Sequence, residues 1–431
     1  MTDFSSFINK KRQVHGTLRS NYSDEQEKVI SAPHNSNGVI IACPGAGKTK
    51  VLLDRVANLI NAGARHENIA LLTFTREAAK QFEDRLKSKG LKLIPLCSTV
   101  HALAYKILLE HQGTVNLITE DDLRQILEKV RTVDKYLIEL SDKEILLEIN
   151  KRRESFDATG WSEIVQAYEK ALAEMNKQDF TSILRAAAEI AAPLFKYVYV
   201  DEFQDLSDLQ HLFIEKIGKQ YFWFVGDPDQ AIYSFKGSSE RVLRILTDGQ
   251  YPVYYLTKNY RGSPEIVSCA NNIIANNRGF RKPITSATPH KGEVSYFDFE
   301  MFEEELQACK KWQADKPDSI ALVRTNRLKD VFISAGIKVL TVHESKGLEW
   351  DYVWVASCEE GVFPHVMSEV QEERRLFYVA VTRAKRFLCM SYSKAGKSSK
   401  ADQIKTKSRF VEESKNNCEV LDIDSLGDDW I

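Results

Sequence analysis

The sequence predicts an α/β protein built on parallel β-sheets, and three features of the chain lead to that fold class. An apolar strand at residues 39–41 runs directly into a glycine-rich turn that ends in Lys-Thr. A second apolar strand, at residues 197–200, ends in a pair of acidic residues. Elsewhere, short apolar strands alternate with stretches of helical periodicity, as they do where helices cover a parallel sheet.

The turn after the first strand, residues 43–49 (CPGAGKT), has the chemistry of a phosphate-binding P-loop. Its glycines allow a tight turn in which backbone N–H groups point at an anion, its lysine reaches the β- and γ-phosphates, and its threonine hydroxyl binds Mg²⁺. Ala42 replaces the first glycine of the usual G-x-x-x-x-G-K-[ST] pattern, and a chance glycine-rich turn is the alternative. We expect a nucleoside triphosphate to contact Gly45, Gly47, Lys48, Thr49 and Lys50.

The acidic pair after the second strand supplies the other half of such a site. We expect Asp201 to hold Mg²⁺ through water, together with Thr49, and Glu202 to orient and deprotonate the attacking water. Acidic pairs also occur simply as solvated ends of strands. The position of this pair, after a buried strand that follows a P-loop, favours the catalytic interpretation.

The remaining strands are short apolar runs, and one long stretch lacks them. Residues 104–192 are charged, with Leu and Ile at helical spacing, and this pattern predicts a helical insertion into the first domain. Further strands are expected at residues 69–74, 222–225, 319–323, 352–356 and 387–391.

Length and composition limit the possible classes of protein. A chain of 431 residues is too long for one hydrophobic core and predicts two or more domains. No apolar run approaches the roughly 18 residues of a membrane span, and the N-terminal region lacks the core of a signal peptide. None of the 7 cysteines has C-x-x-C spacing, which argues against a zinc module, an iron–sulfur cluster or a disulfide framework. The net charge of −2 neither supports nor excludes a nucleic-acid groove.

Nine short segments of the chain follow one another in a fixed order. The two most specific are 201–205 (DEFQD) and 225–233 (VGDPDQAIY). The others are 23–26 (SDEQ), 73–75 (TFT), 99–101 (TVH), 259–261 (NYR), 341–349 (TVHESKGLE), 359–364 (EEGVFP) and 374–384 (RRLFYVAVTRA). Together they resemble the superfamily-one DNA helicases of the UvrD, PcrA and Rep type.

This resemblance implies two RecA-like motor domains, each a parallel sheet of the P-loop NTPase type. We expect the first to comprise residues 1–103 and 193–253, with the insertion at 104–192, and the second to comprise residues 254–410. Residues 411–431 form a polar, acidic tail in this scheme.

The resemblance further implies an ATP-dependent helicase and translocase that moves 3′ to 5′ on single-stranded DNA and acts at junctions with duplex. We expect it to work as a monomer or with weak self-association on DNA, alongside replication or repair proteins. The expected location is the cytoplasm of a bacterium or a phage-infected host, near the nucleoid and away from membranes. Three alternatives stay open: a DNA-stimulated ATPase that displaces proteins without efficient unwinding, a non-catalytic interaction subunit, and an RNA-directed motor.

By the same resemblance, further residues surround the nucleotide. Gln26 is expected to bind adenine through its amide, although Ser23 and Gln26 also have the spacing of a helix capping box, and both roles can hold together. The family further implies adenine stacking by Tyr260, ribose binding by Glu349, coupling of the γ-phosphate to DNA by Gln230, and arginine-finger stabilisation by Arg261 and Arg383 from the second domain. ATP binding would then close the domains on one another.

The family also implies a set of DNA contacts. Aromatic rings are expected to stack on bases, and polar side chains to lie near phosphates. The stacking candidates are Phe74, His101, Tyr233 and Phe235, and the phosphate candidates are Thr73, Thr99, Lys236, Arg324, Thr341 and His343.

Three departures from the family pattern weaken individual expectations. Phe235 and Lys236 stand where relatives carry Trp-Arg, so this part of the DNA grip loses ring area and bidentate geometry. Only a short segment separates Asn326 from Thr341, where relatives insert a large accessory domain. Residues 394–407 are rich in Ser and Lys and lack the aromatic residue of a strand-separating pin. The prediction of translocation therefore rests on more of the sequence than the prediction of unwinding.

Overall fold

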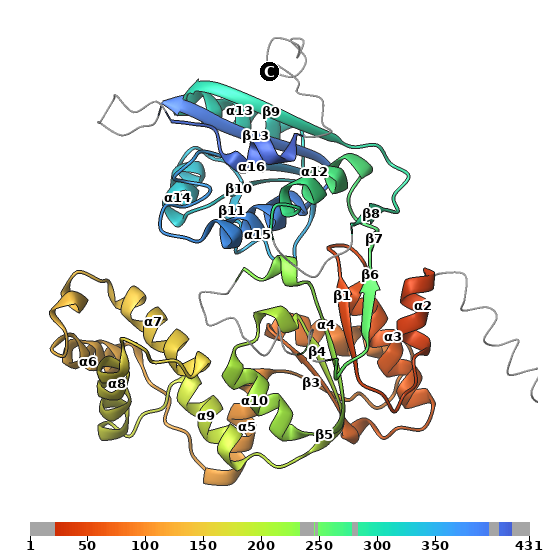
Figure 1. Ribbon diagram of the computed structural model, residues 1–431, viewed down its shortest axis with the longest axis vertical. Coiled ribbons are helices and arrows are strands. Elements are labelled where there is room, and N and C mark those ends of the chain that lie inside the picture. Colours follow the sequence, from red (N-terminus) through yellow and green to blue (C-terminus); the bar gives the residue numbers. More distant parts are fainter. Residues whose placement is uncertain (1–21, 233–244, 246–248, 278–282, 396–404, 416–431) are drawn as a thin grey trace, which may run out of the picture. The chain divides into compact units, whose positions relative to one another are not determined.

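The computed structural model describes residues 22–232, 245, 249–277, 283–395 and 405–415 (Figure 1). Parallel sheets flanked by helices confirm the predicted α/β class. By packing, the chain forms two units. Unit 1 contains residues 22–42, 48–226, 245 and 249–256, and unit 2 contains residues 43–47, 227–232 and 257–415 with the gaps given above. No described helix is long and apolar enough to cross a membrane.

Unit 1 is built on a six-stranded sheet with the order β3-β2-β4-β5-β1-β6, in which every pair is parallel. Its strands are β1 (Gly38–Ala42), β2 (Ile69–Thr73), β3 (Leu96–Thr99), β4 (Phe195–Asp201), β5 (Gly218–Gly226) and β6 (Val253–Leu256). The strands expected from the sequence correspond to β1, β2, β4 and β5 and are confirmed. The edge strands β3 and β6 were not anticipated.

Helices cover this sheet on both faces and bury their apolar stripes against it. A core of Val39, Leu72, Val198, Val200 and Phe224 from the strands packs against apolar residues of α5, α9 and α10. The helices around this sheet are α2 (Asp24–Ser31), α3 (Lys48–Asn61), α4 (Arg76–Ser88), α5 (Val100–Gln112), α9 (Phe180–Ile190) and α10 (Asp208–Ile217), with 3₁₀ turns η2 (His66–Asn68) and η4 (Phe203–Asp205).

The chain between β3 and β4 is helical, and the distal part of this stretch has a core of its own. Helices α6 (Glu120–Arg131), α7 (Asp142–Ser155) and α8 (Ser162–Glu174), with the 3₁₀ turn η3 (Lys135–Ile138), group together at one side of unit 1 (Figure 1). Their shared core includes Ile126, Ile145, Ile149, Tyr168 and Leu172. An isolated bridge between Leu117 and Gln178 joins the two chain segments that lead into and out of this bundle.

Unit 2 contains a five-stranded parallel sheet with the order β11-β10-β12-β13-β9. The strands are β9 (Glu293–Met301), β10 (Ser319–Val323), β11 (Val339–Thr341), β12 (Trp350–Val355) and β13 (Ala384–Ala395), and a separate pair joins β7 (Lys258–Asn259) to β8 (Thr285–Ser286). The helical elements are η5 (Pro228–Gln230), α12 (Pro264–Ile274), α13 (Phe302–Ala314), α14 (Asn326–Ser334), α15 (Val370–Val381) and α16 (Arg409–Ser414).

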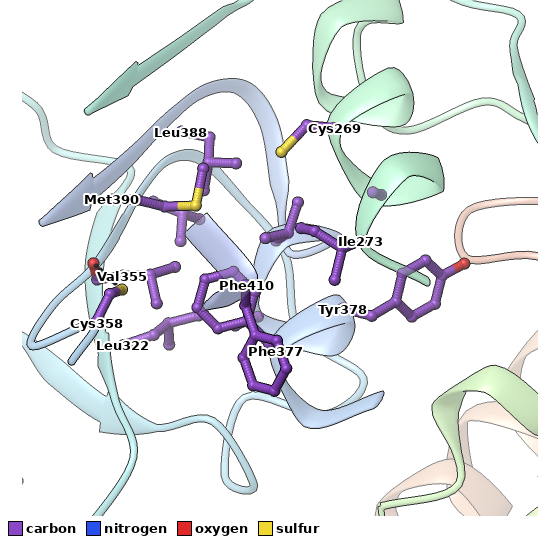
Figure 2. Packing of buried hydrophobic residues seen from close by; sticks show 14 of the residues in the cluster. Cys269, Ile273, Leu322, Val355, Cys358, Phe377, Tyr378, Leu388, Met390 and Phe410 are labelled. Atoms are coloured by element: carbon purple, nitrogen blue, oxygen red, sulfur yellow. Dashed lines mark hydrogen bonds between the residues drawn. The ribbon is translucent and has the colours of Figure 1, made fainter. Parts of the chain in front are cut away.

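One face of this sheet packs against α12, α15 and α16 (Figure 2). The Phe377 ring lies 4.9 Å from the Phe363 ring and 5.3 Å from the Phe410 ring, between ring centroids. Phe410 and Val411 are both buried in this core. The packed part of unit 2 therefore continues through α16, beyond the domain boundary expected at residue 410.

A buried carboxylate ties α13 to β13 and to the segment directly after β12. Glu305 is fully buried and accepts hydrogen bonds from the backbone N–H of Ser357, at 2.8 Å, and from the Ser391 hydroxyl. Ser357 has a left-handed backbone, with φ of 55°, directly after β12. Burial raises the pKa of Glu305 to about 7, against the opposing effect of these hydrogen bonds.

Candidate nucleotide and DNA sites

The glycine-rich turn has the backbone that the P-loop prediction requires. Gly45 and Gly47 have φ values of 69° and 78°, in the region that residues with a Cβ seldom adopt. A Cβ on Gly45 would lie 2.6 Å from the Cβ of Arg261, so no side chain fits there. Within unit 2 the turn is held by Asn259, whose Nδ2 donates to the Pro44 carbonyl at 2.7 Å.

The first residue of α3 meets the acidic pair of β4 inside unit 1. The Lys48 Nζ lies 3.2 Å from Oε1 and 3.3 Å from Oε2 of Glu202. Asp201, the last residue of β4, is buried, and its Oδ1 accepts the backbone N–H of Glu202 at 3.0 Å. The structure thus brings together three residues expected to bind phosphate, hold the metal ion and activate water, which are the parts of a phosphoryl-transfer site.

A fourth side chain, Gln204, completes this group and was not assigned a role from the sequence. Its Nε2 donates to Glu202 Oε2 at 2.6 Å and to Asp205 Oδ2 at 3.4 Å. A Cβ on Gly226 would lie 2.0 Å from Gln204 Oε1, so the neighbouring strand β5 needs glycine there. The only sequence signal was the place of Gln204 in the segment 201–205.

Within unit 2, Arg383 and Gln230 from two separate segments lie in contact. Arg383 is 1% exposed, and its Nη2 donates to Gln230 Oε1 at 3.2 Å. Its Nε and Nη1 donate to the carbonyls of Val379, at 3.0 Å, and Leu348, at 3.1 Å. Gln230 is oriented by its own donation to Asp227 Oδ2 at 2.6 Å. The guanidinium therefore has a fixed direction, as arginine-finger chemistry needs.

The second predicted arginine, Arg261, is hydrogen-bonded to Glu349, the residue expected to bind the ribose. Its Nε donates to Glu349 Oε2, and its Nη1 donates to the Thr382 carbonyl at 3.2 Å. Burial alone would raise the pKa of Glu349, but the charges of Arg261 and Lys385 outweigh it and lower that pKa, so Glu349 is ionised. Tyr260 is 46% exposed, as stacking of its ring on a base would require.

Gln26 forms the capping box that its spacing with Ser23 allows. Gln26 Oε1 accepts the Ser23 N–H at 3.0 Å, and the Ser23 hydroxyl accepts the Gln26 N–H at 3.3 Å. Lys50 lies on α3 with its Nζ 4.3 Å from the centre of the Tyr22 ring. The adenine and phosphate roles of Gln26, Thr49 and Lys50 stay predictions.

Several predicted DNA residues of unit 1 surround one aromatic cavity. This cavity has a volume of about 430 Å³ and is lined by Phe74, Arg76, Thr99, His101, Ala102, Tyr105, Leu117 and Phe180. The His101 and Phe180 rings meet edge to face, with centroids 6.0 Å apart. Thr99 is the N-cap of α5, and Thr73 is buried one residue before Phe74. Phe180 is 61% exposed and was missed from the sequence, where an aromatic residue at a helix start gives no sign of exposure.

Two of the predicted DNA residues of unit 2, Arg324 and His343, lie near the buried Glu373. Arg324 donates from Nε and Nη2 to both oxygens of Glu373, at 2.9 and 2.7 Å. Burial, and secondly the charge of Arg324, lower the pKa of His343 to about 4, so its imidazole is neutral near pH 7. Thr341 caps the turn that follows it by accepting the Glu344 N–H at 3.3 Å. Tyr233, Phe235 and Lys236 lie outside the described residues.

Comparison with known proteins agrees with this geometry. Residues 22–248 match the UvrD/REP helicase N-terminal domain, and residues 319–395 match the UvrD-like helicase C-terminal domain. The chain belongs to the UvrD/REP helicase family. Its members are ATP-hydrolysing DNA helicases whose domains have the RecA-like P-loop NTPase fold, so the resemblance seen in the motifs is confirmed, and with it the RecA-like fold.

Individual relatives cover the chain to different extents. A probable DNA helicase of Mycoplasma pneumoniae is 26% identical over 85% of this chain and 82% of its own length. DNA helicase II of Escherichia coli is 28% identical over 61% of this chain, and the match spans only 41% of that longer protein. DNA helicase IV of Escherichia coli is 24% identical over 89% of this chain and 69% of its own length.

The donor set suits the magnesium ion that such helicases generally need. Magnesium usually keeps several waters and takes one or two protein oxygens together with substrate phosphates, rather than a cage of side chains. Asp201 and the Thr49 hydroxyl are a set of this kind. In the part of the chain that the structure describes, no group of three or more His, Cys, Asp or Glu could form a separate metal cage.

Proposed function

We propose that this member of the UvrD/REP helicase family hydrolyses ATP to move 3′ to 5′ along single-stranded DNA, and that it separates duplex at junctions. The direction is what the family resemblance implies. One observation carries the link between ATP hydrolysis and DNA: the proposed nucleotide residues and DNA residues of unit 1 emerge from the same edge of one parallel sheet. Lys48 follows β1 and Glu202 follows β4, while Phe74 follows β2 and His101 follows β3. Ligands of open parallel sheets bind at the carboxyl ends of the strands.

The strand order gives a route for coupling. β2 lies between β3 and β4, so the strand leading to Phe74 is hydrogen-bonded to the strand that ends at Asp201. A shift of the acidic pair during hydrolysis would therefore reach the aromatic cavity through a single strand. We propose that this short path links nucleotide state to the grip on DNA.

For hydrolysis itself, we propose that Lys48 leaves Glu202 to bind the triphosphate. Glu202, still held by Gln204, then takes the proton of the attacking water. Magnesium, held by Thr49 and Asp201, would neutralise phosphate charge. Arg383 and Arg261 would supply positive charge to the transition state. Gln230, which contacts Arg383, would couple the γ-phosphate to the DNA contacts. Tyr260 and Gln26 would hold the adenine.

A second candidate is a translocase that displaces proteins without efficient unwinding. One observation favours it: only α14 and β11 lie in the interval of residues 326–341, so this described stretch holds no accessory domain. Such a domain is where relatives make duplex contacts, according to the family resemblance.

Strand displacement on partial duplexes with 3′ or 5′ single-stranded tails tests both candidates, beside ATPase measurements with DNA and RNA. The proposal expects ATP-dependent displacement from 3′ tails only and stronger stimulation by DNA. ATPase and protein displacement without strand separation would favour the second candidate. Displacement from 5′ tails alone would contradict the direction.

A further inference from the structure

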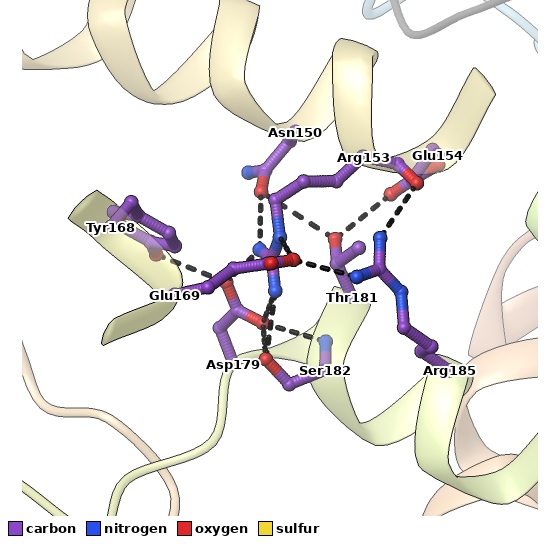
Figure 3. A network of polar contacts seen from close by, with 9 residues as sticks. All are labelled: Asn150, Arg153, Glu154, Tyr168, Glu169, Asp179, Thr181, Ser182 and Arg185. Carbon is purple, nitrogen blue, oxygen red and sulfur yellow. Dashed lines mark hydrogen bonds and ion pairs between the residues drawn. The ribbon is translucent and has the colours of Figure 1, made fainter. Parts of the chain in front are cut away.

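Phe180 is the point where the helical insertion meets the aromatic cavity. It is the first residue of α9, and the residue before it, Asp179, is the N-cap of that helix. Asp179 Oδ1 accepts the Ser182 N–H at 2.7 Å (Figure 3). An N-cap fixes where a helix begins and the direction in which its first residue leaves the axis. The direction of the Phe180 ring therefore depends on how Asp179 is held.

Asp179 is held by a buried arginine from α7. Arg153 Nη1 lies 2.5 Å from Asp179 Oδ2 and its Nη2 lies 3.2 Å from Oδ1, and the Arg153 side chain is 1% exposed. The Tyr168 hydroxyl of α8 donates to Asp179 Oδ2 at 3.0 Å. Although burial alone would raise the pKa of Asp179, the charge and hydrogen bonds of Arg153 hold that pKa below its ordinary value. The pair is ionised and bidentate.

The same network joins all three helices around the pair (Figure 3). Glu169 of α8 accepts from Arg153 Nε at 3.1 Å and from Arg185 Nη1 of α9 at 2.6 Å. Thr181, one residue after Phe180, donates to Glu154 of α7 at 3.2 Å. Buried ion pairs often add little net stability compared with apolar packing of the same volume. Their directional bonds do fix geometry, which is the property that an aromatic contact at the end of α9 needs.

We propose that Arg153 and Asp179 are positioning residues for DNA binding. Their ion pair fixes the start of α9 and so sets the Phe180 ring against His101 in the aromatic cavity, which couples the helical insertion to the grip on single-stranded DNA. Neither residue lines the cavity itself. The inference rests on the proposed function, in which a base stacks in this cavity.

The test compares four variants in DNA-stimulated ATPase. Arg153→Met removes the ion pair with little change of volume, and Asp179→Asn keeps the cap acceptor but removes the charge. Phe180→Ala removes the ring. Arg185→Met is the matched control, because it removes the bonds of Arg185 to Glu169 and to the Arg153 carbonyl but leaves the ion pair of Arg153 with Asp179 in place. A folded state is verified by thermal melting, and Arg153→Lys serves where Arg153→Met is unstable.

We expect Arg153→Met and Asp179→Asn to raise the single-strand concentration for half-maximal stimulation by roughly tenfold, as loss of a stacked ring would. Their kcat at saturating DNA and their KM for ATP should not change, and Arg185→Met should change neither. The double variant of Arg153→Met with Phe180→Ala should be no weaker than Phe180→Ala, since both act through one ring. Additive losses, or normal DNA affinity in folded Arg153→Met, would overturn the proposal.

A DNA-free readout separates this inference from the function on which it rests. In protein labelled with fluorophenylalanine, the Phe180 fluorine resonance is assigned by its loss in Phe180→Leu. Arg153→Met should shift this resonance without DNA, whereas Arg185→Met should not. An unshifted resonance would overturn the positioning role. A shifted resonance combined with normal DNA binding in Phe180→Ala would instead refute base stacking in the cavity.

Discussion

Glu202→Gln should separate nucleotide binding from hydrolysis. The substitution keeps the shape of the side chain, and a glutamine oxygen can still accept from Gln204 Nε2, which now lies 2.6 Å from the carboxylate. It removes the charge opposite Lys48 and the only function proposed for Glu202, acceptance of a proton from water. Lys48, Thr49 and Asp201 remain to bind ATP and magnesium.

The structure also indicates the size of each effect. The Glu202 side chain is 27% exposed, and such partly solvated ion pairs contribute at most about 1 kcal/mol, so folding should be little affected. A general base contributes about 10² to 10⁴ in rate, which corresponds to roughly 3 to 5 kcal/mol of activation free energy. Turnover should therefore fall at least 100-fold, by that estimate, while ATP affinity changes little.

The assay measures DNA-stimulated ATPase and single-strand affinity in the presence of ATP. Glu83→Gln, at a half-buried position on α4, is the matched control for loss of one carboxylate. We expect the Glu202 variant to hold DNA with ATP bound and to hydrolyse almost none of it. A DNA-stimulated rate within about threefold of the unmodified chain would refute the general-base role, because a base contributes far more than that.

Three further predictions follow from other parts of the chain. Arg383→Ala should lower kcat much more than ATP affinity, because the charge of Arg383 is needed in the transition state. A titration of ATP binding that shows affinity reduced by the same factor as kcat would contradict this. Duplex unwinding should slow strongly with GC content and speed up when several molecules load on a long 3′ tail, because each base-pair step costs about 1.4 kcal/mol to unstack. The rate of single-strand translocation should depend on neither. Equal rates of unwinding for AT-rich and GC-rich duplexes would reveal an active opening element. Because the pKa of Glu305 is raised from 4.5 to about 7 in the folded chain, its protonation favours folding below pH 4.5, and that stabilisation is lost as the pH rises through 7. The Tm of the unmodified chain should therefore fall over this pH range, and the Tm of Glu305→Gln should not show this fall. The same dependence of Tm on pH in both proteins would refute the role of Glu305.

The parts of the fold that were predictable are those where burial is continuous. β1, β2 and β10 are buried along their whole length and read as uninterrupted apolar runs. The edge strands β3 and β6 are mostly half-buried and have four residues each, so their sequences carry neither a long apolar run nor clear alternation. β9 mixes buried apolar with exposed acidic residues and resembles a loop in sequence.

For the candidate sites, local motifs were informative and long-range contacts were not. The segment ending in Lys48 and the pair of Asp201 and Glu202 each have a short pattern with a chemical meaning. The contact of Arg383 with Gln230 joins segments far apart in sequence, and only the folded unit shows it. Phe180 and Arg153 have no distinguishing pattern at all, because an arginine in a charged helix is normally a solvated residue.

The most direct test of the central claim is ATP-driven movement along single-stranded DNA. Oligonucleotides of increasing length carry a fluorescent dye at either the 5′ or the 3′ end, and arrival of the protein is followed by stopped-flow fluorescence. The account predicts a lag that lengthens with the DNA when the dye is at the 5′ end, and no such lag at the 3′ end or in the Glu202→Gln variant. A lag independent of length, or one seen only at the 3′ end, would contradict it.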